Sequence, residues 1–200
     1  MTEFKEAVFA GKRKRDIVDD HYGVLARHPR FYDTLTQLCR PERVNPLVVT
    51  LLIGPTGTGK TRAVVDQHGS DPDFWVAPLS NGTIWMDGYD GHSKVLIDDF
   101  AGSASHTTLV YLLRLLDRYP QQVPTKGSHT WWMPDEVFVT TNILPKLWYK
   151  WDNRPEQYKA LARRFHRVHE YHVPLPGVDS RFIAQDPTWW EENKPEEVLY

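Results

Sequence analysis

The sequence predicts an α/β fold in which a central, mainly parallel sheet is flanked by helices. Three short aliphatic runs carry this prediction: residues 47–53 (LVVTLLI), 94–100 (KVLIDDF) and 136–142 (EVFVTTN). Each run is continuous rather than alternating, as in strands buried on both faces of a parallel sheet. The polar residues at their ends indicate a functional site at the carboxyl edge of that sheet.

The segment between the second and third runs predicts a helix that covers the sheet. Residues 105–119 (SHTTLVYLLRLLDRY) place four leucines on one helical face: Leu109, Leu112, Leu113 and Leu116. We therefore expect the helix to pack through this face on the buried strands.

Two further parts flank this α/β domain, which we expect to span residues 44–173. Residues 1–43 carry apolar residues at helical spacing, interrupted by glycine and proline, and predict two or three short helices. Short helices owe most of their stability to tertiary contacts, so these should pack on the next domain or on a neighbouring subunit. Residues 174–200 are rich in proline and acidic residues and predict an extended tail, which Trp189 and Trp190 could anchor.

Composition narrows the possible functions. The formal net charge of −2 gives no global basic field, so any contact with nucleic acid must be local or assembled from several subunits. Cys39 is the only cysteine, which excludes an internal disulfide and predicts a packing residue in a reducing compartment. No stretch has the length and apolar character of a membrane span, so we expect a soluble protein without a membrane partner.

Residues 54–61 (GPTGTGKT) match the phosphate-binding pattern G-x-x-x-x-G-K-[ST] between a predicted strand and a predicted helix. Glycines let backbone N–H groups surround phosphates at the positive end of the helix dipole. We expect ATP and Mg²⁺ as cofactors, with Lys60 neutralising the β- and γ-phosphates and Thr61 ligating the metal. A glycine-rich turn without a ligand is the alternative. The full set of expected nucleotide-binding residues is Gly54, Pro55, Thr56, Gly57, Thr58, Gly59, Lys60 and Thr61.

Polar side chains at the ends of the next two strands suit ATP hydrolysis. Asp98 and Asp99 resemble a Walker B pair, in which one carboxylate, assigned to Asp98, joins the magnesium shell and the other polarises the attacking water. Asn142 could reach the γ-phosphate and the lytic water as a sensor. Aspartate and asparagine also occur after strands for turn geometry alone.

Arg163 and Arg164 end a helix predicted to open near residues 155–156. Arginine there is favoured by the helix dipole, but in a ring-shaped assembly one of the pair could act as an arginine finger in a neighbour's site. Lys126, Gly127 and His129 lie in a polar turn between two extended stretches. The turn could be an ordinary exposed hairpin, or Lys126 and His129 could meet DNA phosphates in a channel.

Two other patterns have less specific interpretations. His166, His169 and His172 invite a zinc site, but in an extended segment His169 would face away from the other two. The basic run at residues 12–15 (KRKR) could be a nuclear import signal, a contact with DNA or with another subunit, or a solvated helix end.

Taken together, these motifs resemble the replication-associated proteins of circular single-stranded DNA viruses, especially circovirus-like ones. Residues 85–102 (WMDGYDGHSKVLIDDFAG) are similar to their Walker B region, and the other motifs follow in the same order over about residues 47–167. Thr56, Ala101 and Thr141 depart from frequent family residues without removing a functional group. The resemblance implies a superfamily 3 helicase core, similar to AAA+ modules, that forms a hexameric ring around single-stranded DNA.

The same resemblance implies roles for the flanking parts and a location in the cell. Residues 1–43 would be an oligomerisation collar, Lys126 would lie in a DNA-binding hairpin, and the protein would act in the host nucleus. The paired-histidine metal motif and the tyrosine nucleophile of the family's nicking domain are not found in context, so we expect a part of a longer protein that does not nick DNA. A nucleotide-dependent DNA-binding scaffold and a small-molecule P-loop kinase are the alternatives to a helicase.

Overall fold

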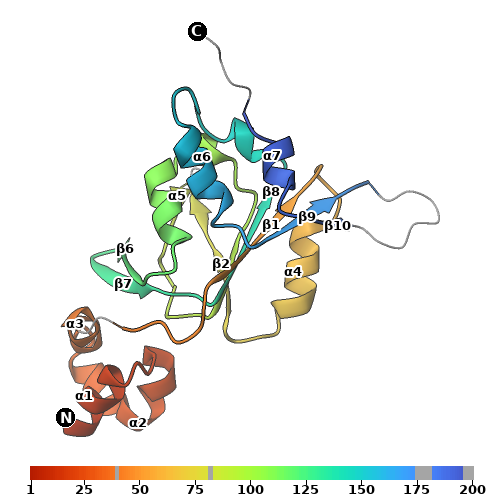
Figure 1. The fold of residues 1–200 in the computed structure, drawn as a ribbon. Helices are drawn as coiled ribbons and strands as arrows, with labels where there is room; N and C mark the ends of the chain where they lie inside the picture. The colour runs from red at the N-terminus through yellow and green to blue at the C-terminus, as the bar shows by residue number, and fades with distance from the viewer. Residues whose placement is uncertain (39–40, 81–82, 174–181, 196–200) are drawn as a thin grey trace.

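The computed structural model describes residues 1–38, 41–80, 83–173 and 182–195, and shows three N-terminal helices beside an α/β body (Figure 1). Cys39, predicted above to pack, lies outside the described residues. No helix in the described ranges has the length and apolar character needed to cross a membrane.

The body is built on a six-stranded sheet with the order β10-β9-β1-β8-β5-β2. Its first five members in the chain run parallel, and only β10 is antiparallel, to β9. The three aliphatic runs form β1, β5 and β8, as predicted, and β8 lies between the other two. The strands are β1 Val48–Ile53, β2 Phe74–Ala77, β5 Lys94–Ile97, β8 Glu136–Thr141, β9 Arg167–Tyr171 and β10 Phe182–Gln185.

Helices cover both faces of this sheet because every central strand buries side chains on both sides. On one face, Val64 of α4 packs in a cluster with Leu52, Leu96 and Phe138. The other face carries the larger core, to which α5, α6 and α7 contribute. The helices of the body are α4 Lys60–His68, α5 Leu109–Leu115, α6 Pro155–Ala162 and α7 Trp189–Glu192, with 3-10 turns η1 Gly102–Ser105 and η2 Pro145–Leu147.

The leucine face of α5 differs in one detail from the prediction. Leu109, Leu112 and Leu116 are buried as expected, but Leu113 is only half-buried and Leu115 is buried in its place. The helix ends at Leu115, and the changed backbone at Leu116 shifts which side chains face the core.

Two small antiparallel ladders lie outside the six-stranded sheet: β3 Leu79–Ser80 with β4 Thr83–Ile84, and β6 Gln121–Thr125 with β7 Ser128–Trp132. The second is a hairpin with the two-residue turn Lys126–Gly127. The hairpin lies on the side of the body that faces the N-terminal helices (Figure 1). Trp131 of β7 donates from Nε1 to the carbonyl of Thr36, 3.0 Å away, which fixes it against those helices.

The N-terminal helices α1 Thr2–Phe9, α2 Lys14–Arg27 and α3 Phe31–Leu38 pack around a hydrophobic cluster of their own. The two arginines of the basic run then join them to the body. Arg13 pairs with Asp73, and Arg15 pairs with Asp90 at 3.5 Å. The alternative of a solvated helix end is therefore wrong for the two arginines, which are half-buried against acidic side chains of the body, whereas Lys12 is exposed.

The prediction of an extended tail was incomplete. Within residues 174–200, the described part adds β10 to the edge of the sheet and forms α7. Trp189 and Trp190 are buried in the main core, and Trp190 stacks on Phe165 at 5.5 Å between ring centroids. The aromatic side chains supply the apolar area that anchors this segment to the body despite its prolines and charges.

Candidate nucleotide site and nucleic-acid interface

The phosphate-binding pattern forms a tight loop between β1 and α4, in the strand-to-helix setting that the sequence predicted. Gly57 and Gly59 have φ values of 81° and 89°, and Gly59 caps α4. Gly54, at φ 152°, lies so close to β9 that an added Cβ would be 2.2 Å from the carbonyl oxygen of Tyr171. The loop therefore depends on glycine for backbone conformation and for close approach. Pro55, Thr56 and Gly57 at its crest are exposed.

Lys60 begins α4 and folds back over the loop. Its Nζ donates to the carbonyl oxygens of Gly54 and Pro55, each 2.8 Å away, and the side chain is 6% exposed. Burial lowers the pKa of Lys60, while the nearby carboxylates of Asp99 and Asp98 act in the opposite direction. A phosphate group brought to the loop would give this buried ammonium an anionic partner in place of two neutral carbonyls.

Asp98 lies at the carboxyl end of β5, where it faces the P-loop helix. Its Oδ1 accepts from the hydroxyl of Thr61 and from the hydroxyl of Thr140, each at 2.6 Å. A hydroxyl and a carboxylate at this distance are the kind of oxygen donors that Mg²⁺ takes beside nucleotide phosphates. The donor set therefore fits a magnesium ion that is shared with a bound nucleotide.

Asp99 is turned differently from its neighbour. It has a φ of 49°, its backbone N–H donates to the hydroxyl of Thr140 at 2.8 Å, and its side chain is exposed. Its Oδ1 accepts from Nδ2 of Asn142 at 3.2 Å. The structure thus brings together two predicted site residues from neighbouring strands, with their polar groups open to solvent at the carboxyl edge of the sheet.

The two arginines after α6 have different surroundings. Arg164 donates from a terminal nitrogen to the carboxylate of Asp117 at 2.5 Å and is half-buried, whereas Arg163 is exposed. Both lie towards the edge of the sheet opposite to the carboxyl edge that carries the P-loop of their own chain. His166, three residues later, donates its backbone N–H to Val49 near the amino end of β1, and the five residues from there to Gly54 span roughly 17 Å.

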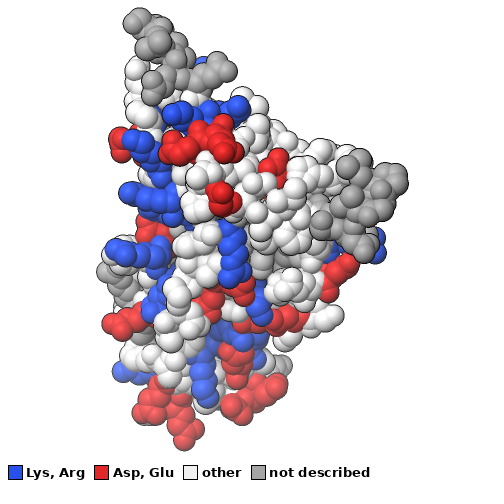
Figure 2. Space-filling model, turned by 45° about the vertical axis from the view of Figure 1, so that its right-hand side comes forward, with Lys and Arg blue, Asp and Glu red and all other residues white. Residues whose placement is uncertain are grey.

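The predicted hairpin is present, and its tip is open. Lys126, Gly127 and His129 are all exposed, and Gly127 has a φ of 75°. The backbone N–H of Lys126 donates to Asp87 at 2.8 Å. Basic and acidic side chains are interspersed over the face of the molecule in Figure 2, in keeping with the small net charge. A contact with phosphates at the hairpin would therefore depend on a few local cations.

The three histidines of the predicted zinc pattern lie in β9 (His169) and directly before and after it (His166 and His172). His166 accepts from the backbone N–H of Val49 through Nδ1 at 3.0 Å, and His169 stacks on Phe182. Within the described ranges, no group of three or more histidine, cysteine or acidic side chains is arranged to hold a metal ion.

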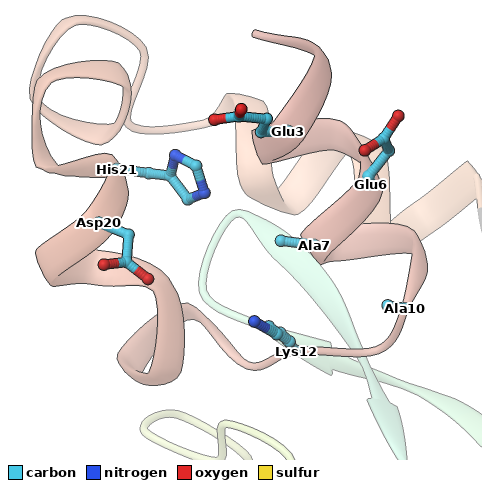
Figure 3. A pocket seen from close by; sticks show the side chains of 7 residues that line it. All are labelled: Glu3, Glu6, Ala7, Ala10, Lys12, Asp20 and His21. Carbon is cyan, nitrogen blue, oxygen red and sulfur yellow. The ribbon is translucent and has the colours of Figure 1, made fainter.

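A pocket of about 540 Å³ opens between α1 and α2, away from the P-loop. Figure 3 shows the imidazole of His21 facing the space between these helices, with carboxylates around it. Acidic side chains would repel nucleotide phosphates, so this pocket does not suit ATP. Its lining residues are Glu3, Glu6, Ala7, Ala10, Lys12, Asp20 and His21.

Sequence reasoning missed three residues that hold the predicted site in place. Thr140 orients Asp98 and Asp99, Asp117 holds Arg164, and Asp87 holds the tip of the hairpin. Thr140 could be found from the sequence, because a polar residue in a buried strand, two positions before Asn142, needs a hydrogen-bond partner. The two aspartates could not, since their partners are distant in the sequence.

Known proteins resemble this chain over most of its length. The sequence model of the family described as RNA helicase matches residues 50–143. The replication-associated protein of Beak and feather disease virus is 34% identical over 180 residues, 89% of this chain and 58% of its own length. That of Pigeon circovirus is 32% identical over 86% of this chain and half of its own length. That of Human associated cyclovirus 1 is 32% identical over 68% of this chain and 49% of its own length.

The chain thus spans about half the length of the curated relatives that it matches. Its matched region contains the P-loop, both aspartates, the hairpin and Asn142, and these occur in the fold expected of a superfamily 3 helicase domain. The chain belongs to the family of circovirus and cyclovirus replication-associated proteins, of which it contains the helicase domain.

Proposed function

We propose that this chain is an ATP-dependent translocase and helicase that moves on single-stranded DNA during rolling-circle replication of a viral genome. The observation that carries the proposal is the junction at the carboxyl edge of the sheet. There the hydroxyl of Thr61, in the P-loop helix, donates to Asp98, which follows β5, at 2.6 Å. Asn142, which follows the neighbouring strand β8, donates to Asp99. These are the positions that hold a nucleotide, a metal ion and an attacking water in P-loop ATPases.

Each residue of the junction has a distinct part in the proposed hydrolysis. The N–H groups of the loop and the ammonium of Lys60 would bind the phosphates of ATP, and Thr61 and Asp98 would hold Mg²⁺. The metal ion, when bound, neutralises charge on the phosphates. Asp99, exposed and hydrogen-bonded to Asn142, would orient and polarise a water in line with the γ-phosphate.

The proposed site is completed by a neighbouring copy of the chain. Arg163 is exposed and lies towards the opposite edge of the sheet from its own P-loop, while Arg164 is occupied by Asp117. Arg163 is therefore the side chain that suits an arginine finger, which stabilises charge on the transferred phosphoryl group from across an interface. A hexameric ring with the N-terminal helices as its collar would place each Arg163 at the next subunit's nucleotide.

The proposed DNA contact is the β6–β7 hairpin, with Lys126 and His129 exposed near its tip. Repetition around a ring would gather several such cations in one channel, which supplies locally the positive charge that the chain lacks as a whole. As a replication protein of this viral family, the chain would work in the host nucleus.

The decisive test is ATPase activity in the presence and absence of single-stranded DNA. Turnover should rise with DNA and vanish in Lys60→Ala, whose thermal unfolding should stay cooperative. Full turnover in that variant would refute the proposal. A small-molecule kinase would consume ATP only with a phosphate acceptor, so stimulation by DNA alone also excludes that alternative.

Asp99→Asn separates a motor from a nucleotide-dependent scaffold. The amide keeps the size of the side chain but removes its negative charge, so nucleotide binding should persist while hydrolysis falls by about 100-fold or more. Strand separation should be lost with it. A scaffold would bind DNA and assemble equally well with either residue. The mass in solution, measured with and without ATP and DNA, tests whether this chain alone forms hexamers.

A further inference from the structure

Trp85 is an exposed aromatic residue between two buried ones. It follows β4, and its neighbours Ile84 and Met86 are 4% and 1% exposed and belong to the main core. Trp85 itself is 41% exposed, and Asp87, which begins the following turn, is half-buried. This alternation is that of an extended segment, in which every second side chain faces outward. The buried neighbours thus fix the indole in an outward orientation.

The outward side of this segment contacts the tip of the hairpin. The ammonium of Lys126 lies 5.7 Å from the centroid of the Trp85 ring, within the range of a cation–π contact. The backbone N–H of Lys126 donates to Asp87 at 2.8 Å. Residues 85 and 87 therefore hold the hairpin tip from one side and place an aromatic face next to the cation proposed to meet DNA.

We propose that Trp85 and Lys126 form one binding site for a nucleotide unit of single-stranded DNA, with the indole stacked on a base and the ammonium on the adjacent phosphate. The inference rests on the proposed function and adds to it a contact with the bases. Aromatic stacking accepts any base, because every base presents a π face. A translocase needs this sequence tolerance, which a hydrogen-bonding side chain does not offer.

The open turn of the hairpin suits the same occupant. A Cβ built on Gly127 would meet no atom within 4 Å, so nothing in the described structure covers the tip beside Lys126. A sugar-phosphate backbone can therefore approach the turn closely while a base reaches the indole.

The test compares two fluorescent single strands of equal length, oligo-dT and its abasic counterpart, which has the same phosphates and no bases. Affinity is measured by anisotropy for the wild-type chain, Trp85→Ala, Trp85→Phe and Lys126→Ala. Trp85→Ala should weaken binding of oligo-dT by roughly 5- to 100-fold, the equivalent of one lost stack, and leave the abasic strand unaffected. Trp85→Phe should keep most of the preference for oligo-dT.

Lys126→Ala should weaken the binding of both strands. It should also make the slope of log affinity against log salt shallower by about 0.7, the value for one phosphate on a single strand. Tyr119→Ala is the matched control: Tyr119 is 51% exposed and precedes β6, at the end of the hairpin away from the tip. Its removal should change neither affinity. Thermal unfolding of each variant verifies that it is folded.

The outcomes separate this inference from the function on which it rests. If the wild-type chain binds neither strand, both are refuted. If it binds oligo-dT and Trp85→Ala binds it equally well, the stacking site is refuted and the helicase proposal stands. If Trp85→Ala loses affinity for both strands alike and its mass in solution falls, Trp85 is a subunit contact and the inference is likewise refuted.

Discussion

Thr140 holds the carboxylate of Asp98 and the backbone of Asp99, so its replacement by valine tests the proposed site with almost no change in shape. Its hydroxyl donates to Asp98 and accepts the backbone N–H of Asp99, and the side chain is 1% exposed. A hydrogen bond to a charged group contributes about 1.5–3 kcal/mol, and an unpaired buried N–H costs about 1–3 kcal/mol. Because Asp98 is half-buried and Asp99 exposed, we take the lower part of each range.

The expected loss for Thr140→Val is therefore about 2–4 kcal/mol, which lowers Tm by roughly 5–15 °C in a chain of this size. Because Thr140 orients a proposed metal ligand rather than binding the metal, ATPase activity should fall by roughly 10- to 100-fold, with a higher magnesium requirement. Thr140→Ser keeps the hydroxyl and should restore the magnesium dependence. Wild-type activity and magnesium dependence in a folded Thr140→Val variant would refute the reasoning.

Three further outcomes are expected. Arg163→Ala should keep its Tm and lose ATPase by about 10³-fold, whereas Arg164→Ala should lower Tm, because it leaves a half-buried aspartate without its partner. In a thermal melt, Gly54→Ala should lower Tm by several degrees, because its Cβ would overlap with the carbonyl oxygen of Tyr171. Burial and Arg15 lower the pKa of His92, so the folded state takes up fewer protons, and stability should fall as the pH drops below about 6.5; denaturant midpoints should show a weaker fall for His92→Gln.

Each of these three predictions would be contradicted by a specific result. Equal melting temperatures for the two arginine variants would show that the ion pair of Arg164 adds nothing to stability. A fully stable Gly54→Ala chain would mean that β9 can move away from the P-loop. An unchanged pH dependence in His92→Gln would assign the whole effect to other histidines, such as His166 and His169, whose pKa values desolvation also lowers.

The sequence was most informative where one pattern determines both conformation and chemistry. Continuous aliphatic runs predicted β1, β5 and β8, and the P-loop pattern placed a phosphate site between β1 and α4. Asp99 and Asn142 were expected at one edge because parallel strands end together, and the structure joins them at 3.2 Å. Their roles in hydrolysis stay predictions.

What could not be predicted depends on contacts between distant segments. The sequence treated Arg163 and Arg164 alike, and only the position of Asp117 after α5 distinguishes them. The acidic and proline-rich composition after residue 173 concealed a strand, β10, that requires the free edge of β9 to form. The basic run at residues 12–15 likewise packs against the body through acidic residues about 60 to 75 positions later in the chain, which the local sequence does not reveal.

The hairpin is held by Asp87 at its tip and by α3 along β7, where Trp131 donates to the carbonyl of Thr36 and Ser128 accepts from Gln37. A loop held in this way has little freedom to swing by itself, so a load applied at its tip is passed to α3 and to the segment before β5. If the hairpin binds DNA, the power stroke is then a displacement of the whole subunit, and force on the strand is transmitted to the N-terminal helices. Trp131→Phe would remove the hydrogen bond to Thr36 and keep the residues proposed to contact DNA. The hairpin would then move more freely against α3, so that less DNA is unwound per ATP hydrolysed.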